Sequence, residues 1–124
     1  MYRYDDREDP PAAYLSVQMT NPDTGVAIHL PAKIDSGAAM SVLPQTAVAN
    51  LALEPMGDIL ASGYDRRATL LPTYSVTFEV EGYTFRDVEV TASPRNDVLL
   101  GRDVLNHFIL TLDGKNLTFD LKDP

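Results

Sequence analysis

The chain of 124 residues has the length of one domain, and its 44% hydrophobic and 23% charged residues are typical of a globular protein rather than a disordered one. It contains no cysteine, which excludes disulfides and thiolate metal sites. Its formal net charge is −8 and its ten lysine and arginine residues are scattered, so we expect no nucleic-acid partner.

Membrane association and metal binding are also not expected. No apolar run in the sequence approaches the length of a transmembrane helix. The N-terminal residues are polar and do not resemble a signal peptide, which makes a cytoplasmic location the default expectation. His29 and His107 are isolated and lack the spacing of metal ligands, so we expect neither a metal nor a cofactor.

Acidic and polar residues dominate residues 1–12, which contain two consecutive prolines near their end. We therefore expect a flexible acidic lead-in, followed by one domain over residues 13–124. Alternating apolar residues flank the turn sequence Asn21-Pro22-Asp23-Thr24-Gly25, a pattern that predicts a hairpin over residues 14–30.

The next part of the chain contains short elements separated by turn residues. We predict strands at residues 32–35 and 41–43, a helix at residues 45–53, and a weak two-stranded stretch at residues 58–71 around Ser62-Gly63-Tyr64-Asp65.

The second half alternates more strongly between apolar and polar residues. Strands are predicted at residues 73–81 and 83–91, and the apolar phase slips between Phe85 and Val88, which indicates a bulge or a change of face. Many short strands with two brief helices predict an all-β fold that is a closed or nearly closed barrel or sandwich. The remaining predicted elements are a strand at residues 97–100, a helix at residues 102–108, and a hairpin at residues 108–121 that turns at Asp113-Gly114.

An acidic residue follows an apolar segment in the sequence Ile34-Asp35-Ser36-Gly37-Ala38. An aspartate between buried residues is costly unless it is hydrogen-bonded or functional. Ser36 can donate a hydrogen bond that fixes a loop, and Gly37 allows another backbone to approach closely. By itself, Asp-Ser-Gly is a weak signal that favours an ordinary turn at the end of a strand over a functional site.

A second motif, Val98-Leu99-Leu100-Gly101-Arg102-Asp103-Val104-Leu105, joins an apolar triplet to a glycine and a short helix. Together the two motifs resemble the retropepsin family of aspartic proteases. The family pattern is an apolar run into Asp-Ser/Thr-Gly-Ala, a glycine-tipped flap, and two apolar residues leading into Gly-Arg-Asp/Asn and a short helix. The three parts occur here in this order over roughly residues 14–112.

The resemblance implies a retropepsin-like barrel that acts as a two-fold homodimer, with Asp35 as the catalytic aspartate. It implies that Ser36 hydrogen-bonds across the dimer axis, and that Gly37 and Ala38 form the floor of the substrate cleft. It assigns Leu99, Leu100, Gly101 and Arg102 to the strand that supports the active-site loop, and Ser62, Gly63 and Tyr64 to the flap.

Two features depart from the retroviral members of this family. In those members the arginine after the glycine pairs with an acid four residues beyond the catalytic aspartate, but that position here is Ala39. Arg102 therefore needs another partner, either a backbone carbonyl or an acid elsewhere. The hairpin at residues 113–121 is an addition, because viral dimer interfaces rely on a short terminal strand.

A single Asp-Ser-Gly per chain cannot supply two catalytic carboxylates, so we expect a homodimer that pairs Asp35 with its own copy. The two carboxylates would share a proton and activate a water that hydrolyses a peptide bond in an extended polypeptide. Two other interpretations stay open. One is a catalytically inactive retropepsin-like module for dimerisation or peptide binding, and the other is a plain β-barrel with a coincidental Asp-Ser-Gly.

Overall fold

The computed structural model describes residues 1–62 and 67–123. Its main sheet has seven strands in the order β2-β3-β8-β4-β7-β6-β5, and β6 pairs back onto β2. This extra pairing closes the first six strands into a barrel, as the all-β prediction required. The bounds are β2 (Tyr14–Thr20), β3 (Ala27–Ile34), β8 (Val98–Leu100), β4 (Val42–Pro44), β7 (Tyr83–Ser93), β6 (Ala68–Val80) and β5 (Gly57–Ser62).

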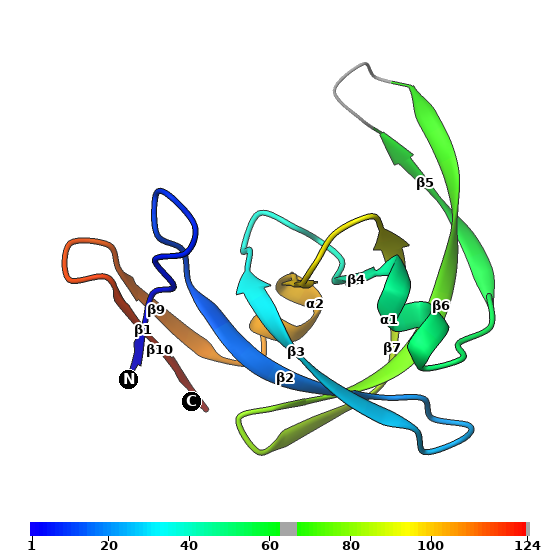
Figure 1. The fold of residues 1–124 in the computed structure, drawn as a ribbon, viewed down its shortest axis with the longest axis horizontal. Helices are drawn as coiled ribbons and strands as arrows, with labels where there is room; N and C mark the ends of the chain where they lie inside the picture. The colour runs from blue at the N-terminus through cyan, green and yellow to red at the C-terminus, as the bar shows by residue number, and fades with distance from the viewer. Residues whose placement is uncertain (63–66, 124) are drawn as a thin grey trace.

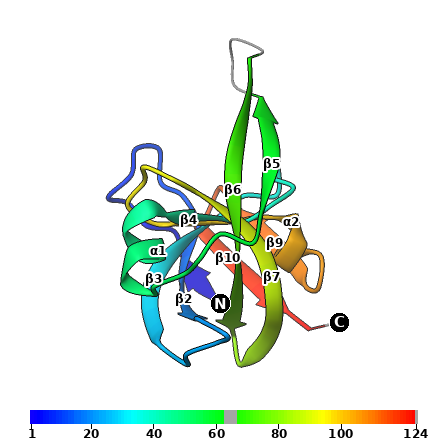
Figure 2. The same cartoon turned by 90° about the vertical axis from the view of Figure 1, so that its right-hand side faces the viewer.

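Two smaller features complete the fold. A three-stranded sheet joins both ends of the chain in the order β1 (Tyr2–Arg3), β10 (Thr118–Lys122) and β9 (Ile109–Asp113). The short helices are α1 (Gln45–Asn50) and α2 (Arg102–Leu105). Figure 1 shows the β5–β6 hairpin projecting from one end of the barrel and the terminal sheet lying at the opposite end, and Figure 2 shows the hairpin rising clear of the other strands.

The barrel interior is filled by the apolar residues whose alternation predicted the strands. Leu15, Val17 and Met19 of β2 are all buried, as are Val76 and Phe78 of β6. Because side chains of a strand alternate between faces, one face of each strand enters the core while the other meets solvent. The register prediction for β7 is also confirmed. Val76 pairs with Val88 but Phe78 with Phe85, so β7 carries the extra residue of a bulge.

Both helices are shorter than the sequence suggested. The helix predicted at residues 45–53 ends at Asn50, and Ala52 adopts a φ of 53°. The side chain of Asn21 donates a hydrogen bond to the carbonyl of Leu51 at 2.8 Å, which satisfies an acceptor left free where α1 stops. The helix predicted at residues 102–108 ends at Leu105.

The N-terminal segment, expected from its composition to be a flexible lead-in, contains a short strand and several contacts with the rest of the chain. Tyr2 lies in β1, which pairs with β10, and its ring stacks on Phe119 with centroids 5.0 Å apart. Glu8 accepts hydrogen bonds from the Lys33 ammonium and, at 2.7 Å, from the Tyr14 hydroxyl. These donors hold the pKa of the Glu8 carboxyl below its usual value. Phe119 and Lys33 lie far from this segment in the sequence, so local composition could not reveal them.

Candidate active site

Asp35 is the first residue after β3, where the chain leaves the barrel sheet. Its backbone N–H donates to the carbonyl of Leu100 at 3.0 Å, and its Oδ1 accepts the N–H of Gly37 at 2.9 Å. The side chain is only partly buried. The carboxylate is therefore held in one orientation at the surface of the chain, where a second group can reach it.

The topology brings the two sequence motifs together. β8 lies between β3 and β4, parallel to β3, with Ile34 opposite Leu100. Leu100 is fully buried, and Leu99 pairs with Val42 at the start of β4. The strand that was expected to support the Asp35 loop thus lies directly beside the strand that carries Asp35.

Gly101 is the point of closest approach between the two motifs. A Cβ added there would lie 2.9 Å from the carbonyl oxygen of Ala38 and 2.9 Å from the carbonyl carbon of Met40. Both contacts are with backbone atoms, which cannot rotate away. The absence of a side chain lets the N–H of Arg102 donate to the Ala38 carbonyl at 2.8 Å.

Of the two kinds of partner expected for Arg102, a backbone carbonyl or an acid, the structure shows a backbone carbonyl. The Nη1 of Arg102 donates to the backbone carbonyl of Ser36 at 3.0 Å. Ala39, at the position of the acid found in retroviral members, is exposed. The guanidinium therefore spans the loop to a carbonyl next to Asp35, instead of pairing with a carboxylate.

The sequence interpretation missed two residues that hold the other end of this loop. Ser41 is fully buried, and its hydroxyl donates to Asp103 Oδ1 at 2.7 Å. The Ser41 N–H donates to Asp103 Oδ2 at 2.9 Å. The available signals were a serine directly before a short apolar strand and an aspartate in the first turn of a helix, and neither implies that the two meet.

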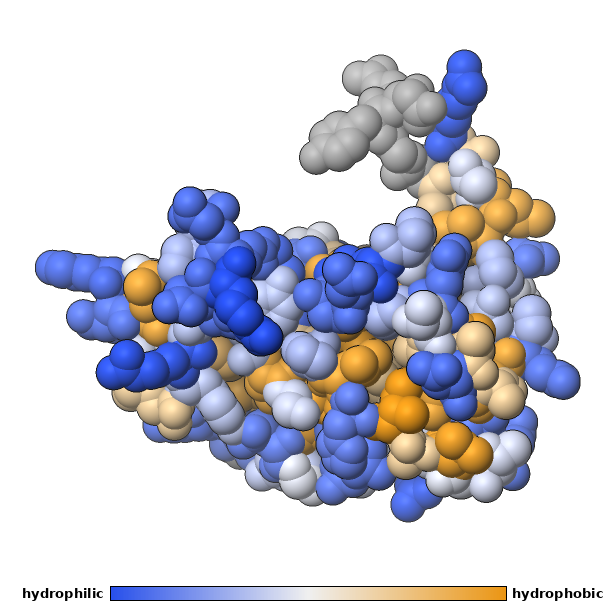
Figure 3. All heavy atoms as spheres, in the orientation of Figure 1, coloured by the Kyte–Doolittle hydropathy of each residue, from blue (hydrophilic) through white to orange (hydrophobic). Residues whose placement is uncertain are grey.

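The predicted flap is described only in part. Ser62 ends β5, whereas Gly63 and Tyr64 lie outside the described residues. Below them, Leu60 of β5 and Leu70 of β6 face each other across the hairpin and are 72% and 62% exposed. Figure 3 shows apolar residues gathered on the projecting hairpin. Such exposed leucines are typical of a surface that meets a ligand or another protein.

Other features of the described residues give no further catalytic group. No three His, Cys, Asp or Glu side chains among them are placed to hold a metal ion. His107 packs against Phe85 with ring centroids 5.0 Å apart and the ring planes tilted by 44°. No helix within the described part of the chain is long and apolar enough to cross a membrane.

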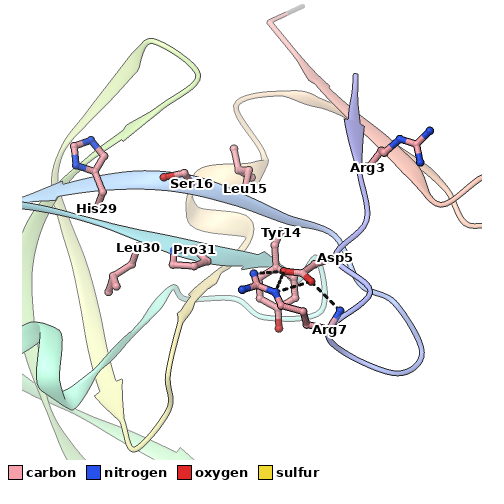
Figure 4. A pocket seen from close by; sticks show the side chains of 9 residues that line it. All are labelled: Arg3, Asp5, Arg7, Tyr14, Leu15, Ser16, His29, Leu30 and Pro31. Carbon is pink, nitrogen blue, oxygen red and sulfur yellow. Dashed lines mark hydrogen bonds and ion pairs between the residues drawn. The ribbon is translucent and has the colours of Figure 1, made fainter.

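A cavity of about 380 Å³ lies beside the N-terminal segment (Figure 4). The Asp5–Arg7 ion pair faces it, and none of the predicted site residues belongs to its lining. It is therefore separate from the Asp35 loop. The lining residues are Arg3, Asp5, Arg7, Tyr14, Leu15, Ser16, His29, Leu30 and Pro31.

The fold and this loop agree with a known class of protein. Residues 27–107 match the model of a family described as gag-polyprotein putative aspartyl protease. The chain belongs to this family, and its barrel is retropepsin-like. None of the curated proteins compared with the chain matches it.

Three solved protease structures are similar to this chain over most of their length. The simian foamy virus (mac) protease is 24% identical with a TM-score of 0.58, covering 76% of this chain and 92% of its own. The protease of EIAV, in complex with the inhibitor HBY-793, is 19% identical with a TM-score of 0.55, covering 77% and 86%. A retropepsin-like aspartic protease from Rickettsia conorii is 17% identical with a TM-score of 0.54, covering 98% and 96%. At these identities the likeness establishes the fold.

Proposed function

We propose that this chain is an aspartic endopeptidase that cleaves extended polypeptides, with Asp35 supplying one of two catalytic carboxylates. The observation that carries the proposal is the Asp35 loop itself. A partly exposed carboxylate is fixed by the Gly37 N–H, on a loop clamped by the Gly101-Arg102 segment, in a chain of the aspartyl protease family. Groups that do chemistry need this kind of fixed geometry.

The second carboxylate comes from a second copy of the chain. Two Asp35 side chains related by two-fold symmetry would share one proton, since close carboxylates do not both ionise readily, as is general for aspartic proteases. The ionised Asp35 takes a proton from a water, and the water oxygen attacks the peptide carbonyl carbon. The protonated Asp35 donates its proton to the carbonyl oxygen. The tetrahedral intermediate then collapses and its C–N bond breaks. The Asp35 that took the water proton gives it to the leaving nitrogen, and the other Asp35 accepts a proton from a hydroxyl of the intermediate, which restores the single shared proton.

Substrate binding uses the space between the Asp35 loop and the β5–β6 hairpin. An extended peptide would lie there as an added strand, with backbone hydrogen bonds supplying affinity and pockets for alternate side chains supplying specificity. The exposed Leu60 and Leu70 support a preference for hydrophobic residues beside the cleaved bond.

The outer edge of β9 is a suitable surface for the second copy. Within the described residues β9 pairs only with β10, so its other edge has free backbone groups. Its first four residues are uncharged, and Ile109 and Leu112 are 54% and 50% exposed. Proteins usually protect such edges with charges or prolines. Antiparallel pairing of two β9 strands about Thr111 would place Leu110 opposite Leu112 of the second copy.

Introducing a charge of either sign at Thr111 tests both assembly and activity. Thr111→Lys and Thr111→Glu are each expected to weaken the dimer about fivefold or more, because like charges would face each other across the two-fold axis. An equal mixture of the two variants should recover dimer formation and peptide cleavage together. Sedimentation and cleavage of a peptide library are measured on the same dilution series.

The matched controls are Thr46→Lys and Thr46→Glu, which place the same charges on an exposed position of α1. A Thr111 pair that dimerises like the controls would reject the β9 interface. A fully active monomer would reject the shared catalytic site, and dimers without any cleavage would favour an inactive peptide-binding module.

A further inference from the structure

Ser41 and Asp103 form a closed hydrogen-bonded unit next to the Asp35 loop. The carboxylate of Asp103 accepts both the hydroxyl and the N–H of Ser41, at 2.7 and 2.9 Å. The Ser41 hydroxyl oxygen in turn accepts the N–H of Gly101 at 3.0 Å. The buried Ser41 hydroxyl thus both donates and accepts a hydrogen bond, which fixes its orientation.

The unit fixes the one end of the loop that the other contacts leave free. The Asp35 end is attached to Leu100, and the middle is attached to Arg102 through the carbonyls of Ser36 and Ala38. Ser41 is the end at which the chain enters β4, and its partner Asp103 is 62 positions away in the sequence. The loop from residue 35 to residue 41 is therefore held at both ends and in the middle by residues 100–103.

Asp103 is suited to this task because of its charge. An ionised carboxylate forms stronger hydrogen bonds than a neutral acceptor does. Its Oδ1 also accepts the N–H of Val104 at 3.0 Å, at the start of α2. Among the described residues no cation forms an ion pair with Asp103, so its charge is directed at the Ser41 donors and the helix start.

We infer that Ser41 and Asp103 are positioning residues for the Asp35 carboxylate. This inference rests on the proposed function, since it concerns the same site. Neither side chain would touch the substrate. Together they set the height and tilt of the Asp35 loop, so that two Asp35 carboxylates can share one water. Displacements well under an ångström matter for such a pair, because catalytic groups must be held within about 0.5 Å of their productive geometry.

The test compares Ser41→Ala, Asp103→Ala and the double variant with wild-type enzyme, well below their melting temperatures. Each single variant should lower kcat roughly 10- to 100-fold while KM stays within about twofold, because positioning acts on the reacting groups rather than on substrate binding. The double variant should lose little more than either single variant, since the two residues act as one unit. Ser41→Thr, which keeps the hydroxyl, should recover most of the kcat.

Ser16→Ala and Asp23→Ala serve as matched controls, because both side chains are exposed and neither belongs to the Asp35 loop. A purely structural role would lower the melting temperature and leave the kcat of the folded protein unchanged, which would overturn the inference. The inference would also be overturned if the loss of kcat in the double variant equalled the product of the losses in the two single variants, because the residues would then act independently.

A second readout is independent of catalysis. Hydrogen exchange of the Gly37 and Ala38 amides should be faster in Ser41→Ala and Asp103→Ala than in the controls, because both amides bond to Asp35. If the wild-type protein cleaves nothing, the proposed function fails, but faster exchange at these amides would still support the positioning role. Unchanged exchange would overturn it whether or not the protein is a peptidase.

Discussion

Replacing Asp35 with asparagine is expected to abolish peptide cleavage while leaving the fold and the dimer intact. The change removes a group that takes and gives protons but keeps an oxygen that can accept the Gly37 N–H. General acid–base catalysis contributes about 10²- to 10⁴-fold to a rate, and both roles are lost here, so the residual activity should be at most about one hundredth. The loss of activity is measured as the cleavage rate at a protein concentration well above that needed for dimer formation. A thermal melt shows whether the fold is intact.

The matched control for this prediction is Asp23→Asn, which makes the same chemical change in the exposed turn between β2 and β3. It should cleave peptides at the wild-type rate. An Asp35→Asn protein that also cleaves at that rate would remove Asp35 from the mechanism. A protein that no longer melts cooperatively would instead show that Asp35 is needed for folding.

Gly101→Val is expected to lower stability and activity together. A Cβ at this position would lie 2.9 Å from backbone atoms of Ala38 and Met40, which is closer than Cβ atoms come to such neighbours in real proteins. The valine adds two further methyl groups. Overpacking of this kind costs about 1–3 kcal/mol. The backbone that must move belongs to the Asp35 loop, so the carboxylate moves with it, and kcat should fall in the fraction that remains folded.

Gly114→Val is the natural comparison, because a Cβ at Gly114 has no neighbour within 4 Å and its φ is not positive. Thermal melts and cleavage rates of both variants should separate the local collision from the general effect of losing a glycine. Equal melting temperatures and equal rates for the two variants would show that the loop does not depend on the space at Gly101.

The barrel could be predicted from the sequence because its information is local. The alternation of Leu15, Val17 and Met19 set the face of β2, and the phase slip after Phe85 marked the bulge in β7. The meeting of the Asp35 loop with Gly101 was predicted only through the family pattern, since nothing in either motif alone says that they are neighbours.

Contacts between distant residues account for what the sequence could not provide. Ser41 and Asp103 each look like ordinary polar residues at an element boundary, and their relation appears only when β8 and α2 pack against the loop. The stacking of Tyr2 on Phe119 was not predicted for the same reason. The composition of a polar, proline-containing segment is the same whether the segment packs on the domain or extends freely into solvent. Arg102 could be assigned a class of partner but not the Ser36 carbonyl itself.

The most direct test of a catalytic pair built from two chains is to mix wild-type protein with Asp35→Asn at a fixed total concentration, well above that needed for dimer formation. If both carboxylates are required, only dimers of two wild-type chains are active. An equal mixture that has exchanged subunits at random should then show about a quarter of the all-wild-type rate. A rate of about half, in proportion to the wild-type chains present, would mean that each chain works alone and would contradict the shared site.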